Sequence, residues 1–476
     1  MATKKDLVEA YSFSRRRLVT AFVSGAPGGR EVEPARPGRM IVGGVALAIL
    51  LVAGAAVAGA LTDRAPVKWT EPGLVTDDHG ALYVILDEER AGADPRLRPV
   101  INVTSAQLIL GAGVKTQSVP DDELAAQQKG PSIGILNAPP TVPPADRLVN
   151  GGWISCTADT IGIRTEVRPE VDVRNASGQG FLVRAAASGK RYLIAEADVP
   201  GHPVRAYRYE LPARNDGLDA DLRVSTADQI EVPDEWLSLF PQGGALDAAG
   251  LGLEGWGTPF DLPGYGRVRV GDYHVRGGAT FAATRDGFVR LTGFATAVLQ
   301  NTPIGAGRPR AIEAASATAD FDTAPQVPYA DASWPTEVLD GSAASTDTVC
   351  GVLETEEGEE PAVRLATFPP GSTMLEDVGA GERSVTVEPG YGALVRAGGW
   401  NSSSGGIVHL VDDSGRIYSV AGDDEVVNLG YESVPAVVVP AAWNKLFRPG
   451  PDLSILDALC PPQADGEGEA AGPTCS

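Results

Sequence analysis

Histidine is scarce in this sequence of 476 residues, which contains four. The four stand apart from one another, and none belongs to an HExxH string or lies beside a GxSxG string. Those strings position a zinc ion with its base, or a nucleophile on its turn, so their absence argues against zinc proteases and serine hydrolases. We therefore expect no catalytic or metal-binding role for His79, His202, His274 and His409.

A nucleotide-cradling loop is also missing. Such a loop needs the string GxxxxGK[ST], in which backbone N–H groups hold the phosphates and the lysine neutralises them. The nearest imitation is Gly111–Thr116, whose spacing is wrong and which fits a turn followed by a strand. The sequence therefore predicts no cofactor.

Two acidic strings resemble fragments of functional sites. Asp77–His79 brings a carboxylate close to an imidazole, as a base and its orienting partner would be. Turn chemistry before a strand explains it equally well. Asp412–Gly415 begins like a calcium loop but lacks the later ligands and the terminal glutamate, so it predicts a hairpin turn.

Clustered positive charge is absent from most of the chain, whose net charge is −23. Binding to nucleic acid phosphates needs such clusters, so nucleic acid is not an expected partner. The charge is also divided unevenly. Residues 1–39 carry a net charge of +4, and the 415 residues after position 61 carry −27.

Only one long apolar run occurs, from Met40 to Leu61. Its 22 residues contain no charge and no proline, and as a helix they would extend about 33 Å at roughly 1.5 Å per residue. That length spans a bilayer core of roughly 30 Å. The basic flank predicts a cytoplasmic N-terminus and a large acidic domain outside. A cleaved signal peptide is the alternative, but the run and the segment before it are longer than such peptides have.

The segment before this run divides into two parts. Residues 3–24 place most of their apolar side chains on one helical face, which predicts a basic amphipathic helix on the inner membrane surface or on a cytoplasmic partner. The alternative is a basic segment whose only role is to set the membrane topology of the chain. Residues 25–39 contain Gly, Pro and Arg and read as a linker.

Cysteine is limited to four residues, all after the apolar run. An even number in an oxidising compartment predicts disulfides, and four cysteines allow three pairings. The sequence does not choose among them, although the short tail loop favours Cys460 with Cys475 and leaves Cys156 with Cys350.

Apolar residues make up 43% of the chain, enough for a packed core, and the 57 Gly and 37 Pro indicate many turns and short strands. Residues 131–146 are rich in proline and must be extended loop. Residues 100–110 read as a strand leading into a helix. Strands are expected at Ala81–Leu86, Trp153–Cys156, Phe181–Ala185, Arg191–Ala195, Arg267–Val270, Gly287–Leu291 and Val385–Val387.

An internal repeat is the most informative feature of the acidic part. Seven identities recur at a constant offset of 207 residues. Each unit reads as a hairpin followed by a short helix, and a related hairpin before it aligns Ser188, Gly189 and Tyr192 with Ser414, Gly415 and Tyr418. Residues 82–111 and 287–313 are candidates for more diverged copies. The identities are Val232, Pro233, Trp236, Leu239, Phe240, Gly243 and Leu246 with Val439, Pro440, Trp443, Leu446, Phe447, Gly450 and Leu453.

A set of collinear strings resembles the EccB family, the single-pass core component of type VII secretion systems. The similarity covers nearly the whole chain, and its most specific block is 80–156. The strings are Gly80–Val84, Arg98–Ala106, Lys129–Pro131, Gly134–Ile135, Ala138–Pro139, Trp153 and Cys156, with Tyr11, Phe13, Arg16 and Arg17 before them and Pro389–Val395, Leu429–Tyr431 and Gly450–Leu453 after them.

The resemblance implies a plasma-membrane protein with four repeat modules around a β-rich core, the repeats being similar to a phage-lysin cell-wall-binding subunit. It also implies a disulfide at the positions of Cys156 and Cys350, and assembly with EccC, EccD and EccE. Some family members are described as ATPases, so ATP is the one cofactor to consider. Cys460 and Cys475 do not map onto the family pattern.

We therefore predict an α+β, β-rich fold and a structural subunit of a secretion complex that pairs with a second copy and with the lipid bilayer. A nucleotide hydrolase and a cell-envelope binding module are the alternatives. The expected divisions are a cytoplasmic basic amphipathic segment (1–39), a transmembrane helix (40–61), a first repeat module with linker (62–155), a central core with repeat modules (156–350), the core return with the last module (351–459) and a tail (460–476).

Overall fold

Two units make up the chain, Met1–Pro66 and Val67–Ser476. No helix among the described residues is long and apolar enough to cross a membrane. The predicted transmembrane helix Met40–Leu61 and the predicted linker 25–39 lie outside the described residues. The computed structural model describes residues 4–24, 68–212, 216–314, 323, 328–329, 332–368 and 373–462.

The described part of the first unit is the helix α1 (Lys4–Ser24), which confirms the predicted helix. Leu7, Tyr11 and Leu18 are spaced by four and seven residues and share one face. Phe13 lies on the opposite face. All four side chains are exposed within this unit.

A six-stranded sheet forms the centre of the second unit, in the order β20-β6-β5-β18-β19-β7. Its middle strands β5 and β18 are antiparallel, with Cys156 opposite Cys350. A disulfide joins these two residues, as predicted. Cys460 is also disulfide-bonded, and its predicted partner Cys475 lies outside the described residues. The strands are β5 (Trp153–Thr157), β6 (Ile163–Val167), β7 (Arg174–Asn175), β18 (Thr348–Glu354), β19 (Ala362–Phe368) and β20 (Arg383–Val387).

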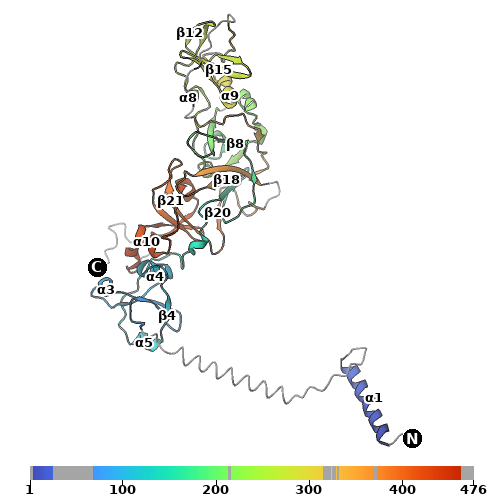
Figure 1. The fold of residues 1–476 in the computed structure, drawn as a ribbon, viewed down its shortest axis with the longest axis vertical. Helices are drawn as coiled ribbons and strands as arrows, with labels where there is room; N and C mark the ends of the chain where they lie inside the picture. The colour runs from blue at the N-terminus through green and yellow to red at the C-terminus, as the bar shows by residue number, and fades with distance from the viewer. Residues whose placement is uncertain are drawn as a thin grey trace. The chain divides into compact units, whose positions relative to one another are not determined.

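Four copies of one unit flank this sheet, two on either side of it (Figure 1). In each copy three antiparallel strands are followed by a helix, after which the chain returns parallel to the first strand and then to the third. We name the copies repeat 1 (73–130), repeat 2 (179–243), repeat 3 (273–323) and repeat 4 (393–450).

The predicted β-rich α+β fold is therefore confirmed, and the two diverged segments each belong to a repeat. The elements are β1 (Gly73–Thr76), β2 (Leu82–Ile85), α3 (Glu88–Ala91), β3 (Leu97–Pro99), α4 (Val103–Leu110), β4 (Thr116–Ser118) and α5 (Asp121–Ala125) in repeat 1; β8 (Gln179–Ala185), β9 (Arg191–Ala197), β10 (Arg205–Leu211), α6 (Asp216–Asp221), η2 (Thr226–Asp228), β11 (Ile230–Val232) and α7 (Asp234–Leu237) in repeat 2; β14 (Tyr273–Arg276), β15 (Ala279–Thr284), β16 (Gly287–Arg290) and α9 (Gly293–Asn301) in repeat 3; and β21 (Ala393–Gly398), β22 (Val408–Val411), β23 (Arg416–Val420), α10 (Asp423–Asn428), β24 (Val437–Pro440), α11 (Ala441–Asn444) and β25 (Arg448–Pro449) in repeat 4.

The remaining elements connect or extend the repeats. A hairpin before repeat 3 packs on its sheet through Val268 and Phe288. The predicted strands are all present, and the proline-rich segment 131–146 contains no strand. The strand expected to begin at Val100 instead lies just before it, at Leu97–Pro99, because Asn102 caps α4 three residues after Pro99. These elements are η1 (Ala145–Arg147), α8 (Ala248–Leu251), β12 (Pro259–Leu262), β13 (Gly266–Arg269), β17 (Gly341–Ser342) and α12 (Ile455–Ala458).

The identities at offset 207 mark the return of the chain in repeats 2 and 4. In both, a proline precedes the short helix α7 or α11, and a tryptophan one turn later is fully buried. Trp236 donates its indole N–H to the Ser155 carbonyl (3.0 Å), and Trp443 donates to the Leu239 carbonyl (3.2 Å). These contacts of the two tryptophans hold repeats 2 and 4 on the central sheet and hold the two repeats against each other.

The predicted hairpin alignment is wrong by one strand. Gly189 lies between the first and second strands of repeat 2, whereas Gly415 lies between the second and third strands of repeat 4. The partner of Tyr418 is therefore Tyr209 on β10, not Tyr192. Both glycines have positive φ in tight hairpins, so the local sequence is the same in two successive hairpins and does not tell them apart.

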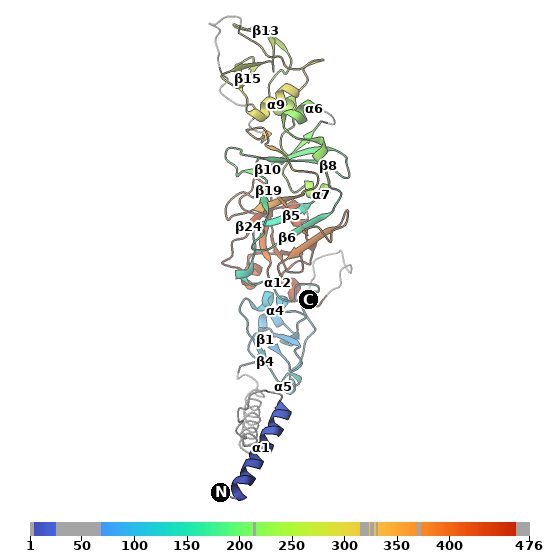
Figure 2. The ribbon, with the colours of Figure 1, turned by 90° about the vertical axis from the view of Figure 1, so that its right-hand side faces the viewer.

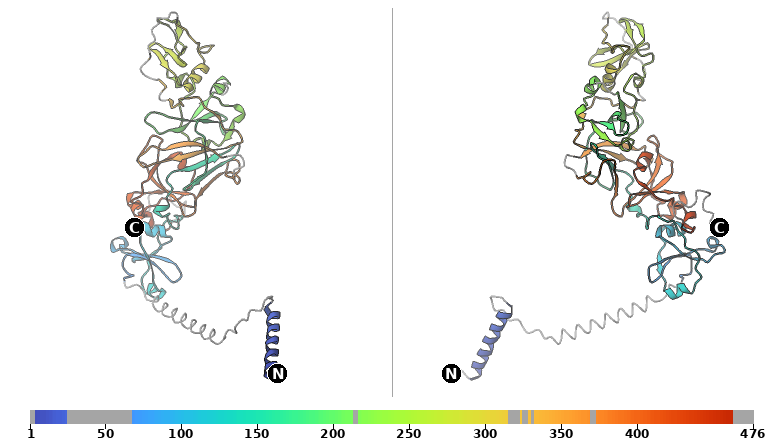
Figure 3. Two further views of the ribbon diagram at one scale, coloured as in Figure 1. Left: turned by 45° about the vertical axis from the view of Figure 1, so that its right-hand side comes forward. Right: turned by 180° about the vertical axis from the view of Figure 1, so that it is seen from behind.

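Equivalent helices join the repeats in pairs. α4 packs against α10 between repeats 1 and 4, and α6 packs against α9 between repeats 2 and 3. The last residue of one helix crosses each joint: Asn428 donates to the Leu108 carbonyl (2.7 Å), and Asn301 donates to Asp221 (2.6 Å). α12 also packs on α4, as Figure 2 shows, and the first and fourth repeats adjoin in both views of Figure 3.

One close contact recurs where the chain returns to the third strand. The N–H of Gly450 bonds the Ile417 carbonyl (2.8 Å), and the glycine Cα lies against the ring of Tyr418. A Cβ at Gly450 would be 2.3 Å from two atoms of that ring. In repeat 1 the equivalent Gly130 faces Arg98 and Pro95, and a Cβ there would be 3.2 Å from the Arg98 Cγ and 3.2 Å from the Pro95 carbonyl oxygen.

We expect Gly450→Ala to lower the free energy of unfolding by about 2 kcal/mol, because an extra methyl group in a packed core forces the neighbours to move. Gly130→Ala is the matched control and should cost less than about 1 kcal/mol, since contacts of 3.2 Å require the neighbours to move much less than contacts of 2.3 Å do. Urea unfolding followed by tryptophan fluorescence measures both. Equal losses in the two variants would contradict the assigned contact.

Candidate functional site

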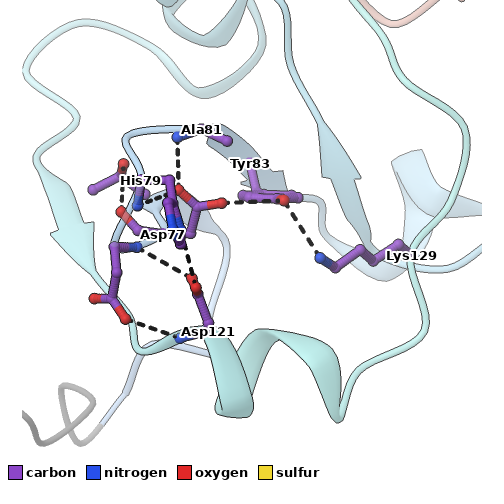
Figure 4. Close-up of polar contacts among 8 residues, drawn as sticks. Asp77, His79, Ala81, Tyr83, Asp121 and Lys129 are labelled. Atoms are coloured by element: carbon purple, nitrogen blue, oxygen red, sulfur yellow. Dashed lines mark hydrogen bonds and ion pairs between the residues drawn. The ribbon is translucent and has the colours of Figure 1, made fainter.

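The loop between β1 and β2 gathers the acidic string Asp77–His79 beside α5 (Figure 4). One carboxylate oxygen of Asp77 accepts the N–H groups of His79 (3.0 Å) and Ala81 (2.7 Å), which closes a turn before β2. The imidazole Nδ1 of His79 lies 3.0 Å from a carboxylate oxygen of Asp121. The turn explanation is therefore confirmed, and the imidazole pairs with Asp121, not with Asp77.

Asp77, His79 and Asp121 also form one group in the described part of the chain that could hold a metal ion. Their ligand atoms lie within 4.8 Å of one another. The second oxygen of Asp77 accepts from the Tyr83 hydroxyl (3.5 Å), whose ring faces the Lys129 ammonium. The His79 side chain is 81% exposed, so the group has no walls to fix its geometry. The turn and the Tyr83 hydroxyl together account for both Asp77 oxygens.

The string Gly111–Thr116, which imitates a phosphate loop, begins at the end of a helix. Gly111 caps the C-terminus of α4 with φ +94°, and β4 begins at Thr116. A phosphate loop runs from a strand into a helix N-terminus, where free N–H groups point at the anion. Here the chain runs from a helix into a strand, so Gly111–Thr116 offers helix carbonyls instead, as the turn-and-strand prediction implies.

The acidic string Asp412–Gly415 is a hairpin turn, as predicted. Asp412 is buried and accepts from the Ser414 N–H (3.0 Å) and hydroxyl (2.7 Å), the Arg416 N–H (3.0 Å) and the Tyr418 hydroxyl (2.8 Å). Burial and the bond to Asp412 raise the pKa of the Tyr418 hydroxyl. A cavity of about 390 Å³ lies between this turn and residues 137–141.

The other histidines have structural partners. The Nδ1 of His274 lies 2.9 Å from the Ile312 carbonyl, and its ring contacts Tyr265 and Phe288. The Nδ1 of His409 lies 3.0 Å from the Ile407 carbonyl, and burial lowers the pKa of this imidazole. The Nδ1 of His202 lies 2.7 Å from Glu360, in a cluster that the sequence did not predict.

This cluster surrounds Arg205, whose side chain is 1% exposed. Its guanidinium pairs with Glu360 from the β18–β19 turn and donates to the Trp400 carbonyl (2.6 Å) from the β21–β22 connection. Repeat 2, the central sheet and repeat 4 therefore meet at one buried cation. The partners lie 155 and 195 residues from Arg205, and no local string signals such a joint.

A second ion pair holds repeat 2 on the central sheet. Glu196 of β9 has a side chain that is 6% exposed, and it accepts from the Arg364 guanidinium (2.8 Å) and the Leu365 N–H (2.8 Å). The hydrogen bond to Glu196 raises the pKa of Arg364, against the effect of burial. The ion pairs of Arg205 and Glu196 thus both lie at joints between modules.

We expect Glu360→Gln to lower the free energy of unfolding at pH 7 by roughly 3 kcal/mol, because it leaves the Arg205 charge buried without its partner. Burial alone would raise the pKa of Glu360, but the hydrogen bonds and charges of His202 and Arg205 outweigh it and lower this pKa. The stabilisation is therefore present above the unfolded pKa of about 4.3 and is lost as the pH falls below it.

Thermal unfolding between pH 3 and pH 8 should accordingly give a flatter acid limb for Glu360→Gln than for the natural chain. The exposed neighbour Glu359 supplies the control, and Glu359→Gln should keep the natural acid limb. An unchanged acid limb in Glu360→Gln would contradict this role of the joint.

A family model described as "Type VII secretion system ESX-1, transport TM domain B" matches residues 1–464. The chain is 25% identical over 454 residues to the ESX-1 secretion system ATPase EccB1 of Mycolicibacterium smegmatis, covering 88% of this chain and 87% of the relative. It is 27% identical over 439 residues to the ESX-3 secretion system ATPase EccB3 of Mycobacterium tuberculosis, covering 80% and 75%.

Solved structures share the fold. A chain of an intact ESX-5 inner membrane complex superimposes with a TM-score of 0.59 at 21% identity, over 99% of this chain and 98% of that one. A chain of the EccB3 dimer from the ESX-3 core complex gives a TM-score of 0.59 at 20% identity, over 82% and 100%. With a family match along nearly its whole length, this chain belongs to the EccB family of type VII secretion system proteins.

Proposed function

We propose that the chain is a membrane-anchored structural subunit that organises a type VII secretion translocation complex through its extracytoplasmic repeat domain. The observation that carries this proposal is that the polar groups described above hold structural elements together. The buried ion pairs at Arg205 and Glu196 join repeats to the central sheet, and the sequence strings resembling catalytic or metal sites close turns. Repeats that bury their faces against one another suit binding by surface.

The topology is part of the proposal. Residues 40–61 would cross the membrane once, with 1–39 in the cytoplasm and the repeat domain outside, as the charge difference between the two flanks supports. The further divisions are part of the same proposal: the first repeat with its linker (62–155), the core with repeat modules (156–350), the core return with the last repeat (351–459) and the tail (460–476).

The partners proposed are proteins of the EccC, EccD and EccE type and a second copy of the chain. Two similar chains come from structures described as an inner membrane complex and a dimer, which supports both kinds of contact. The Leu7, Tyr11 and Leu18 face of α1 is the proposed cytoplasmic docking surface, since it is apolar and exposed within its unit.

ATP hydrolysis is the second candidate function, because curated relatives carry the word ATPase in their names. The candidate loop Gly111–Thr116 runs the wrong way for a phosphate site. If it nevertheless held a nucleotide, Lys115 would be its cation.

Purification of the tagged full chain in mild detergent should recover a membrane ATPase and a multi-spanning partner, identified by mass spectrometry. The triple substitution Leu7→Ser, Tyr11→Ser and Leu18→Ser should reduce that recovery at least about fivefold, because it removes the apolar face. Phe13→Ser, on the opposite face, is the control and should retain it.

Recovery of the chain alone would count against the secretion-complex role. ATP turnover by the purified chain that disappears in Lys115→Ala would favour the hydrolase instead.

The topology is tested by labelling intact cells with a membrane-impermeant maleimide. Val275→Cys, at an exposed position of repeat 3, should be labelled on intact cells, and Phe13→Cys only after lysis. The natural cysteines give little background where they are disulfide-bonded. Labelling of Phe13→Cys on intact cells, or protection of Val275→Cys, would overturn the proposed orientation.

A further inference from the structure

Repeat 3 and the hairpin before it carry positive charge within an acidic domain. Residues 259–313 contain seven arginines and four acidic residues, a net charge of +3, whereas the chain after position 61 carries −27. All seven arginines are exposed, and one of the four acidic residues, Asp272, is buried. The surface of this module is therefore basic.

Three of these arginines lie together at the hairpin β12–β13. Arg267 and Arg269 are two residues apart on β13 and point to the same side, opposite the buried Val268 that packs on repeat 3. The main-chain N–H groups of Arg269 and Arg310 donate to the two carboxylate oxygens of Asp272 (2.9 Å each). This shared acceptor holds Arg310 beside Arg269.

Arg285 joins them from the turn between β15 and β16. Its guanidinium donates to the Thr258 hydroxyl (3.2 Å) and lies 5.9 Å from the centre of the Phe260 ring. These two residues flank Pro259, which is the cross-strand partner of Arg269. We define the basic surface as Arg267, Arg269, Arg285 and Arg310.

The acidic residues of this module offset the basic surface only in part. Asp261 lies 3.6 Å from Arg267, but the two side chains are 78% and 68% exposed, so water screens the pair. Asp272 is buried, and its two oxygens already accept main-chain N–H groups. In the described part of the chain no ion pair involves Arg269 or Arg285. The surface therefore has guanidinium groups that a partner can bind.

The turn between β18 and β19 has the opposite charge. Five glutamates occur within residues 354–360. Three of them, Glu356, Glu357 and Glu359, are exposed and form no ion pair with any described residue. Burial raises the pKa of Glu354, and the neighbouring charge of Glu356 acts in the same direction. Like charges held in one turn repel one another, so an approaching cation lowers their energy.

We propose that the basic surface of one copy binds the β18–β19 turn of a second copy. This inference rests on the second-copy contact proposed above and names the two surfaces that form it. Arginine suits a glutamate partner, because its planar guanidinium binds a carboxylate through two parallel hydrogen bonds. One exposed ion pair adds little, so the contact depends on several charges acting together and weakens as salt is added. A two-fold pair of copies would form it twice.

Two charge reversals test the contact on the full chain, purified in non-ionic detergent at low salt. Arg267→Glu with Arg269→Glu reverses the basic surface and keeps the main-chain bond to Asp272 that shapes the hairpin. Glu356→Arg with Glu357→Arg reverses the turn. Self-association, measured by sedimentation velocity, should weaken at least about tenfold in each variant, because like charges then face each other.

A mixture of the two reversed variants separates a specific contact from a general loss. In the mixed pair each contact again joins opposite charges, so association should return to within about threefold of the natural chain. Arg174→Glu with Arg448→Glu is the control, since it changes the net charge as much as the first variant does, at exposed positions elsewhere. It should associate as the natural chain does.

Four results would overturn the proposal. They are no self-association of the natural chain, unchanged association in both variants, an equal loss in the control, and a mixture as weak as each variant alone. Recovery of the secretion partners from the same preparations is a separate readout. If those partners are recovered while self-association ignores these charges, this inference fails and the proposed function stands.

Discussion

The pairing of β5 with β18 is the constraint on which the rest of the structure depends. These strands are separated by 194 residues at their cysteines, yet they lie side by side at the middle of the central sheet. Repeats 2 and 3 are therefore an excursion between two neighbouring strands. A disulfide at this position closes that excursion and reduces the freedom of the unfolded chain over its whole length.

Repeats 1, 2 and 4 each have two ends with different chemistry. One end is the helix that pairs with the equivalent helix of another repeat, in the combinations 1 with 4 and 2 with 3. The other end is the short helix after the returning strand, which buries Trp236 or Trp443 against the centre. In repeat 1 the same place, three residues after Pro120, is occupied by the exposed Glu123. A terminal repeat needs a polar end, and Glu123, at the position held by tryptophan in repeats 2 and 4, provides one.

Two enclosed ion pairs lie where modules meet. Arg205 and Glu196 are the most enclosed members of ion pairs that link repeat 2 to the central sheet, and Arg205 also reaches repeat 4. Such pairs add little to stability compared with apolar packing but are costly to break, so they favour one arrangement of the modules over others. A subunit that presents surfaces to partners depends on that fixed arrangement.

Sequence alone determined the features that local chemistry sets. Alternating apolar residues and glycines gave the short strands, prolines gave the loop at 131–146, and the Val-Pro-Trp strings identified the return of the chain in repeats 2 and 4. The acidic string at Asp412 is the predicted hairpin turn, and of the two explanations open for Asp77 the turn is the one confirmed, because a turn needs only neighbouring residues. Tertiary structure decided everything that requires distant residues to meet. It chose Cys350 for Cys156, aligned Tyr418 with Tyr209, and brought Glu360 and Trp400 to Arg205, since burial and strand order act between residues that the sequence keeps far apart.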